Sequence, residues 1–170
     1  MSSIWLTGLS GAGKTTLGTL LCQWYKDNGK SVVFLDGDEL RKRINKDLGF
    51  SEDDRLENVR RVAEINQLLQ KNNISVINCF IAPTNSMRKL IRSIVTDDLI
   101  MIFLNTSIET CRARDPKGLY KKVADGKITN FTGISGVFEP FLDADLILST
   151  DQSIESSLKE LKQFIASRLD

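Results

Sequence analysis

The stretch Gly8-Leu9-Ser10-Gly11-Ala12-Gly13-Lys14-Thr15 decides the fold of this chain. It follows the pattern of a phosphate-binding loop, in which a glycine and four further residues precede Gly-Lys-Ser or Gly-Lys-Thr. The flanks fit this interpretation, because residues 4–7 are typical of a short buried strand and residues 16–24 of a helix. The stretch therefore predicts an α/β protein with the P-loop NTPase fold. The alternative is a glycine-rich turn that binds no ligand.

Binding of a nucleoside triphosphate requires particular backbone groups in such a loop. Its β- and γ-phosphates need backbone N–H groups that point inward, and glycines allow this close approach. The N-terminus of the next helix adds a favourable dipole. Lys14 is expected to reach the β- and γ-phosphates, and the Thr15 hydroxyl is expected to bind Mg²⁺. We therefore expect ATP and Mg²⁺ as cofactors and assign to ATP binding Gly8, Leu9, Ser10, Gly11, Ala12, Gly13, Lys14, Thr15 and Thr16.

The composition is that of an ordinary globular chain. Of the 170 residues, 41% are hydrophobic and 26% are charged, and the net charge of +1 gives no reason to expect a nucleic-acid or membrane partner. No apolar stretch approaches the roughly 20 residues of a membrane span, and we expect no signal peptide. The cysteines are isolated, which favours reduced thiols in a cytoplasmic protein. The chain has no histidine, so Asp, Glu, Lys or Arg must carry any acid–base chemistry.

Strands and helices alternate along the chain. Apolar runs predict further strands at residues 31–35, 74–80, 99–104 and 146–148. Helical spacing predicts helices at residues 39–44, from Ser51 onward, at 86–95, at 107–114 and over 154–165. This order implies a central parallel β-sheet of about five strands flanked by helices, in a single domain spanning residues 1–170. Residues 115–143 hold four glycines and little periodicity, which predicts a lid.

Burial can be predicted for individual strand and helix positions as well. Within the predicted strand 31–35, residues 32–35 are continuously apolar, as a buried parallel strand should be. The inner face of the helix after Ser51 is expected to carry Leu56, Val59, Val62, Ile65 and Leu68. The last helix is expected to turn one face inward with Ile154, Leu158, Leu161 and Ile165. Cys79 is expected to pack as a small buried hydrophobe, with a place beside a functional site as the alternative.

Two carboxylates follow the second predicted strand. Because ligands bind at the carboxyl ends of parallel strands, the loops after the first four strands should surround one cleft. Asp36 and Asp38 would lie there opposite the phosphate-binding loop, where they could orient Mg²⁺ or accept a hydroxyl proton. We assign Asp36, together with Thr15, to the metal ion. The alternative is an N-cap pair for the short helix that follows.

Arginines and two loop phenylalanines indicate a second, phosphate-bearing substrate. Arginine forks suit such a substrate, and aromatic rings in glycine-rich loops can sandwich a base. The candidate arginines are Arg41, Arg55, Arg60, Arg61 and Arg88, and the candidate rings are Phe50 and Phe131. The alternative for the arginines is a solvated helix face with pairs such as Glu57 and Arg61.

Several longer motifs resemble those of adenylyl-sulfate kinases. They are Leu35-Asp36-Gly37-Asp38 with Arg41, Asn45-Lys46-Asp47-Leu48-Gly49-Phe50-Ser51, Asp54-Arg55, Glu57-Asn58, Arg60-Arg61, Phe80-Ile81, Arg114-Asp115-Pro116-Lys117-Gly118-Leu119-Tyr120-Lys121-Lys122 and Phe131-Thr132-Gly133-Ile134. The resemblance covers about residues 3–150. It implies a P-loop kinase that phosphorylates the ribose 3′-hydroxyl of adenylyl sulfate with ATP.

The resemblance also implies roles for individual residues. Asp38, Lys14 and Lys117 would be catalytic, with Asp38 on the hydroxyl and Lys117 on the transferring phosphate. Arg114 would join the ATP site. The small nucleotide acceptor, the expected partner, would be held by Asp38, Arg41, Phe50, Arg55, Asn58, Ile81, Lys117 and Phe131. Phosphoryl transfer of this kind depends mostly on positioning and charge stabilisation. A monomer and a homodimer are both compatible with these motifs.

The chain departs from the family pattern on the acceptor side. The differing segments are Ala82-Pro83-Thr84-Asn85, Val123-Ala124 after the lysines, and Phe138-Glu139-Pro140-Phe141. These changes lose a hydroxyl and two arginines. They leave cytidine diphosphoramidate, in capsule biosynthesis, as an alternative acceptor beside adenylyl sulfate in sulfate assimilation. A nucleoside monophosphate kinase and a catalytically silent ATP-binding protein are further alternatives.

Overall fold

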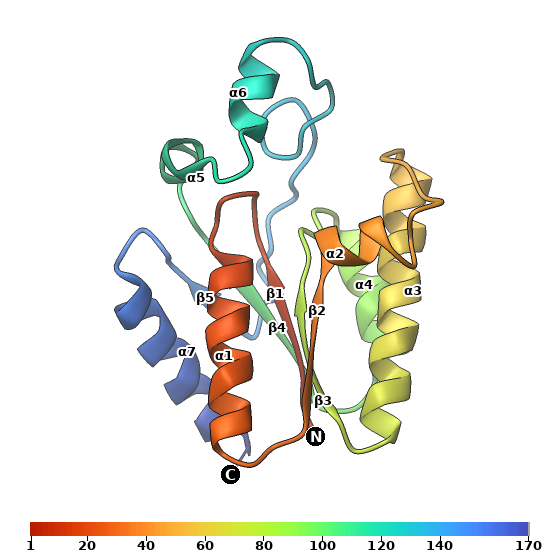
Figure 1. Ribbon diagram of the computed structural model, residues 1–170, viewed down its shortest axis with the longest axis vertical. Helices are drawn as coiled ribbons and strands as arrows, with labels where there is room; N and C mark the ends of the chain where they lie inside the picture. Colours follow the sequence, from red (N-terminus) through yellow and green to blue (C-terminus); the bar gives the residue numbers. More distant parts are fainter. Residues whose placement is uncertain (170) are drawn as a thin grey trace.

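A five-stranded parallel sheet forms the centre of the molecule (Figure 1). The computed structural model describes residues 1–169. The strands are β1 (Ser3–Thr7), β2 (Val32–Asp36), β3 (Ser75–Cys79), β4 (Leu99–Leu104) and β5 (Leu146–Leu148). Their order across the sheet is β2-β3-β1-β4-β5, and all neighbouring pairs run parallel. The predicted sheet is thereby confirmed, with β1 at its centre.

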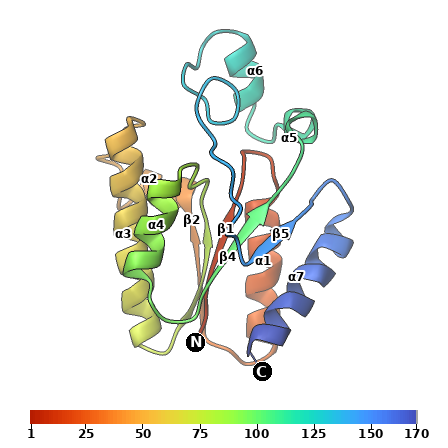
Figure 2. The same cartoon turned by 180° about the vertical axis from the view of Figure 1, so that it is seen from behind.

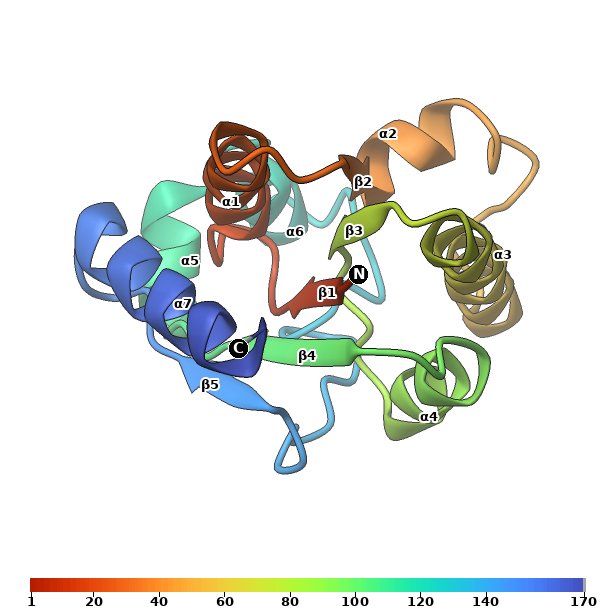
Figure 3. The same ribbon diagram turned by 90° about the horizontal axis from the view of Figure 1, so that it is seen from below.

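Helices cover both faces of the sheet. The helices of residues 1–169 are α1 (Lys14–Asp27), α2 (Gly37–Lys42), α3 (Glu52–Lys71), α4 (Asn85–Ile94), α5 (Ile108–Arg114), α6 (Leu119–Ala124) and α7 (Ile154–Leu169). Seen from below, α1 and α7 lie on one face and α3 and α4 on the other (Figure 3). In Figure 1, α5 and α6 lie beyond the carboxyl ends of the strands, on the side opposite both chain termini. The sequence order thus places every βα loop at one edge of the sheet.

Alternation along β1 divides the core into two clusters. Ile4 and Leu6 pack with residues of α1 and α7, whereas Trp5 packs with residues of α3 and α4. All three side chains are fully buried. This follows from the strand period of two, which sends successive side chains to opposite faces of the sheet. Because both faces are covered by helices, each face needs apolar residues, and the middle of β1, from Ile4 to Leu6, is continuously apolar.

Three expectations about burial were wrong. Strand β2 is not buried throughout, because it is the edge strand of the sheet and only Leu35 is buried in it. Leu68 is 63% exposed, and its neighbour Leu69 packs against the core in its place. Ile154 is 52% exposed because it is the first residue of α7. Helical spacing shows which residues share a helix face, but it does not show at which residue the helix stops packing against the sheet.

The segment predicted as a lid contains structure that periodicity did not indicate. Residues 119–124 form α6, and a bridge pairs Thr132 with Gly136. After α6 the chain runs back along the sheet to β5 (Figure 2). Glu139 N–H donates to the Pro83 carbonyl at 2.9 Å, which fastens this return segment to the loop after β3.

Cys22, Cys79 and Cys111 are free and buried. Within residues 1–169, no helix has the length and apolar character needed to cross a membrane.

Candidate active site

A cavity of about 1460 Å³ opens at the carboxyl ends of the strands. It is lined by sixteen of the residues that the sequence assigned to a site, namely Ser10, Gly11, Gly13, Lys14, Thr15, Thr16, Asp36, Asp38, Arg41, Phe50, Arg55, Asn58, Ile81, Arg114, Lys117 and Phe131. Three assigned residues, Gly8, Leu9 and Ala12, do not line it. The first two contribute carbonyls to the back of the loop, and Ala12 is buried.

The phosphate-binding loop joins β1 to α1 in the conformation that its glycines permit. Gly11 and Gly13 have φ angles of 80° and 93°, a backbone conformation that residues other than glycine rarely adopt. The Lys14 ammonium donates to the carbonyls of Gly8, at 2.9 Å, and Leu9, at 2.7 Å. Burial lowers the pKa of Lys14 to about 8, well below its ordinary value. The lysine side chain is therefore folded back onto its own loop.

Asp36 connects the loop to α2. Its Oδ2 accepts a hydrogen bond from the Thr15 hydroxyl at 2.8 Å, and its Oδ1 accepts one from the Asp38 N–H at 2.9 Å. Asp36 is therefore the N-cap of α2, as the alternative interpretation held, and at the same time a neighbour of Thr15. The two predicted metal-binding oxygens lie in hydrogen-bond contact.

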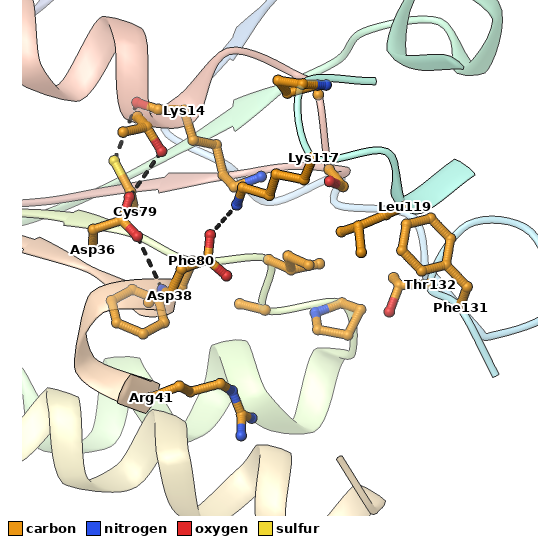
Figure 4. A pocket seen from close by; sticks show the side chains of 18 of the residues that line it. Lys14, Asp36, Asp38, Arg41, Cys79, Phe80, Lys117, Leu119, Phe131 and Thr132 are labelled. Atoms are coloured by element: carbon orange, nitrogen blue, oxygen red, sulfur yellow. Dashed lines mark hydrogen bonds and ion pairs between the residues drawn. The ribbon is translucent and has the colours of Figure 1, made fainter. Parts of the chain in front are cut away.

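Asp38 contacts a lysine from the opposite side of the cavity. The Lys117 ammonium, which comes from the segment between α5 and α6, forms an ion pair with the Asp38 carboxylate. Figure 4 shows Lys14 and Lys117 both pointing toward Asp38. The fold thus brings together the three residues predicted as catalytic, Lys14, Asp38 and Lys117, although they lie far apart in the sequence.

The acceptor candidates Arg41, Phe50, Arg55 and Asn58 lie on the α2–α3 side of the cavity, whereas Ile81 follows β3 and Phe131 follows α6. Phe50 is 69% exposed, and the Arg41 guanidinium lies over its ring, 4.8 Å from the centroid. Burial lowers the pKa of Arg41. Asn45 donates to Asn58 Oδ1 at 3.0 Å, so that the buried Asn58 side chain has a fixed orientation.

Three other arginines have structural partners. Arg60 and Arg61 both bind Glu57, and Arg61 also forms two hydrogen bonds with Asp47. Hydrogen bonds from the two arginines lower the pKa of Glu57 to about 2. Neither Arg60 nor Arg61 lines the cavity, so the helix-face interpretation was right for both.

Arg88 is buried and donates to the Glu139 and Pro140 carbonyls at 3.1 and 3.0 Å. Its guanidinium also lies 4.5 Å from the ring centroid of Phe141. It does not line the cavity. Arg88 therefore holds the return segment in place and does not face a ligand.

The loop after β5 also reaches the cavity, which the sequence interpretation missed. Thr150 and Gln152 from this loop line it, together with Ile154 and Ser157 from the first turn of α7 and Cys79 from the end of β3. The rule that ligands bind at the carboxyl ends of strands applies to β5 as well, and applying it to the fifth strand would have found this loop.

The departures from the family pattern lie mostly away from the cavity. Within the differing segments, Ala82 and Pro83 line it. Thr84 is the N-cap of α4, and Asn85 Oδ1 accepts a hydrogen bond from Arg88 at 2.7 Å. The changed side chains at positions 84 and 85 therefore serve the start of α4.

The parallel sheet, the phosphate-binding loop and the charged cavity define the class of this protein as a P-loop kinase, an enzyme that transfers a phosphoryl group to a hydroxyl acceptor. More narrowly, the chain belongs to the adenylylsulphate kinase family, whose pattern matches residues 1–149. The resemblance in the motifs is confirmed.

Individual relatives agree. The chain is 46% identical to the adenylyl-sulfate kinase of Paraburkholderia xenovorans (strain LB400) over 149 residues, which cover 88% of this chain and 83% of that protein. It is 44% identical to that of Pseudomonas entomophila (strain L48) over 149 residues, 87% and 72% of the two chains. The solved Mycobacterium tuberculosis APS kinase, in complex with AMPPNP and APS, superimposes with a TM-score of 0.93 at 38% identity, covering 97% of each chain.

Proposed function

We propose that this protein transfers the γ-phosphoryl group of ATP to the 3′-hydroxyl of adenylyl sulfate. The observation that carries the proposal is the meeting of Lys14, Asp38 and Lys117 in one cavity, in a chain of the adenylylsulphate kinase family. Sulfate assimilation follows as the setting, in a cytoplasmic enzyme whose cysteines stay reduced.

The phosphate side of the cavity binds ATP. The Lys14 ammonium leaves the Gly8 and Leu9 carbonyls and pairs with the β- and γ-phosphates, while the loop N–H groups hold the phosphate oxygens. Thr15 and Asp36 present two oxygens 2.8 Å apart, and such hard donors suit Mg²⁺. When bound there, the ion would neutralise phosphate charge.

Asp38 and Lys117 act at the reacting atoms. The Asp38 carboxylate orients the acceptor hydroxyl and accepts its proton, since no histidine is available for this task. Lys117 moves from Asp38 to the transferring phosphoryl group, whose charge it stabilises. The ion pair holds the two side chains together at one point of the cavity.

The acceptor nucleotide occupies the α2–α3 side. Phe50 and Phe131 stack on its base. Polar contacts come from Arg41, Arg55, Asn58 and the Ile81 backbone, all of which line the cavity. We further propose that residues 115–143 close over the bound nucleotides as the lid of a single domain spanning residues 1–170. Two copies associating as a homodimer would be detected by light scattering of the purified protein.

An acceptor panel tests this function. The purified protein is incubated with Mg-ATP and adenylyl sulfate, cytidine diphosphoramidate or a nucleoside monophosphate, and ADP and the phosphorylated product are quantified. We expect turnover with adenylyl sulfate and phosphorus at its 3′ position. Faster turnover of another acceptor would overturn the assigned substrate, and ATP binding without transfer to any acceptor would identify a silent nucleotide-binding protein.

A further inference from the structure

The outer side of the phosphate-binding loop is held by side chains from distant parts of the chain. The Tyr120 hydroxyl, from α6, donates to the Ser10 carbonyl at 2.8 Å. The Thr150 hydroxyl, from the loop after β5, donates to the Ala12 carbonyl at 2.8 Å. Two alternate carbonyls of the loop are thus each bound by a hydroxyl more than a hundred positions away in the sequence.

These bonds fix the direction of the peptide planes. In a trans peptide the carbonyl and the following N–H point in opposite directions. A Ser10 carbonyl that points to Tyr120 therefore directs the Gly11 N–H the other way, and Thr150 has the same effect on Gly13. Gly11 and Gly13 line the cavity, whereas Ala12 does not. The hydroxyls thus act on the two peptides whose N–H groups face the phosphates in the proposed function.

Both hydroxyls are themselves held firmly. Tyr120 and Thr150 are buried. Asp115 accepts hydrogen bonds from the Tyr120 and Lys121 N–H groups at 3.1 Å, which fixes the first turn of α6. Thr150 Oγ1 lies 2.6 Å from Thr106 Oγ1. A buried hydroxyl with fixed partners selects one loop conformation, because a rotated peptide would take the carbonyl away and leave the buried hydroxyl without this acceptor.

We propose that Tyr120 and Thr150 are positioning residues for phosphoryl transfer: they hold the Ser10 and Ala12 carbonyls outward so that the Gly11 and Gly13 N–H groups face the nucleotide. The inference rests on the proposed function. Neither residue touches the reacting atoms in this scheme. They act through the loop, which they set before ATP arrives, so that no loop rearrangement is needed on binding.

The test measures nucleotide binding apart from catalysis. The full-length protein and its Tyr120→Phe and Thr150→Val variants are titrated with Mg-AMPPNP by calorimetry, without acceptor. Removal of either hydroxyl is expected to raise the Kd about tenfold. The KM for the acceptor is expected to stay within about twofold in Thr150→Val.

Two matched variants separate positioning from packing. Tyr25→Phe also removes a buried tyrosine hydroxyl, one that lies 2.7 Å from Ser2 Oγ, and Tyr25 is about 16 Å along α1 from Lys14. It should change the Tm and leave the Kd unchanged. Thr150→Ser keeps the hydroxyl and should restore the wild-type Kd.

Two results would overturn the inference, and they are distinguishable. Wild-type affinity for AMPPNP in both Tyr120→Phe and Thr150→Val, with only the Tm lowered as in Tyr25→Phe, would show that the hydroxyls serve packing alone. A wild-type protein that binds no AMPPNP would overturn the proposed function, and this inference with it.

Discussion

Arg55 on α3 donates a hydrogen bond from its Nη1 to Thr132 Oγ1 at 3.0 Å, across 77 positions of the chain. The same guanidinium donates to the Asn130 carbonyl at 3.3 Å and to the Phe50 carbonyl at 2.9 Å. One side chain therefore binds both segments that carry the proposed base-stacking rings, because Phe131 lies between Asn130 and Thr132. Arg55 therefore connects the two halves of the proposed acceptor site.

Thr132→Val should weaken acceptor binding. The change removes the hydroxyl that accepts from Arg55 while it keeps the side-chain volume, so that the segment around Phe131 loses a contact to α3. Because the lost hydrogen bond has a charged donor, we expect the acceptor KM to rise about three- to tenfold. Steady-state kinetics with varied acceptor measures this. Thr132→Ser, which keeps the hydroxyl, should behave as wild type, and an unchanged KM in Thr132→Val would contradict the role of the bond.

The sheet could be predicted from the sequence because its strands are short, continuous apolar runs. Strand β1 has Ile4, Trp5 and Leu6 buried on two faces, and such a run has few other interpretations. Helix α6 could not be predicted in the same way. It has six residues, and its first turn is held by the Asp115 carboxylate, while Tyr120 is held by the Ser10 carbonyl. These are tertiary contacts, which periodicity does not report.

The candidate site could be predicted in part, for a similar reason. The phosphate-binding motif predicts that Lys14 and Thr15 lie in the cavity. The position of Asp36 and Asp38 at the end of a predicted strand indicates the same for them. The sequence does not indicate which arginines pair with carboxylates. Arg41 and Arg61 look alike in the sequence, yet Arg61 pairs with Asp47 and Glu57, whereas Arg41 donates to the Gly49 carbonyl at 2.7 Å. The distinction depends on how the α2–α3 loop folds back on α3.

Asp38→Ala should abolish most of the catalysis and leave ATP binding intact. The carboxylate is the proposed proton acceptor, and such a group contributes a factor of about 10²–10⁴ to kcat. Stopped-assay kinetics gives kcat, and calorimetry with Mg-AMPPNP gives the Kd. Asp53→Ala, which removes an exposed carboxylate outside the cavity, is the control. A kcat within a few-fold of wild type would exclude the assigned role of Asp38.

Phe50→Ala should act on the acceptor and not on ATP. Its ring is exposed and lies against Arg41, so that little core packing is lost with it. Stacking on a base stabilises a complex by about 1–3 kcal/mol, which predicts a matching rise in the acceptor KM. Leu142→Ala removes an exposed apolar side chain outside the cavity and should change neither KM. If the acceptor KM stayed constant in Phe50→Ala, the ring would not stack on the base.

Gly18→Ala should destabilise the fold. An added Cβ would lie 2.6 Å from Cys79 Sγ and 2.7 Å from Phe34 Cε2, because α1 packs closely on β2 and β3 at this glycine. Alanine favours a helix by about 1 kcal/mol over glycine, yet overpacking costs about 1–3 kcal/mol. We expect a net loss in the free energy of unfolding, measured by urea denaturation. Gln23→Ala, on the exposed side of α1, should leave the stability unchanged, and equal stability of the two variants would contradict the predicted clash.

Nucleotide affinity should fall as the pH rises above about 8. Burial lowers the pKa of Lys14 to about 8 in the free protein, and bound phosphates will raise it because they favour the charged form. Below pH 8 the lysine is protonated in both states, so that affinity is constant. Above pH 8 only the bound state keeps the proton, and the Kd should rise about tenfold per pH unit until the pKa of the complex is reached.

Calorimetry with Mg-AMPPNP at pH 7 to 9.5 measures this dependence. Repeating the pH 9 titration in buffers of different ionisation enthalpy counts the protons that the complex takes up, which should approach one. Lys14→Arg keeps a charge that does not titrate in this range, so its weaker binding should lose the pH dependence. A wild-type Kd that is constant from pH 7 to 9.5, with no proton uptake on binding, would contradict this prediction. It would mean that Lys14 is already protonated over this range before nucleotide binds.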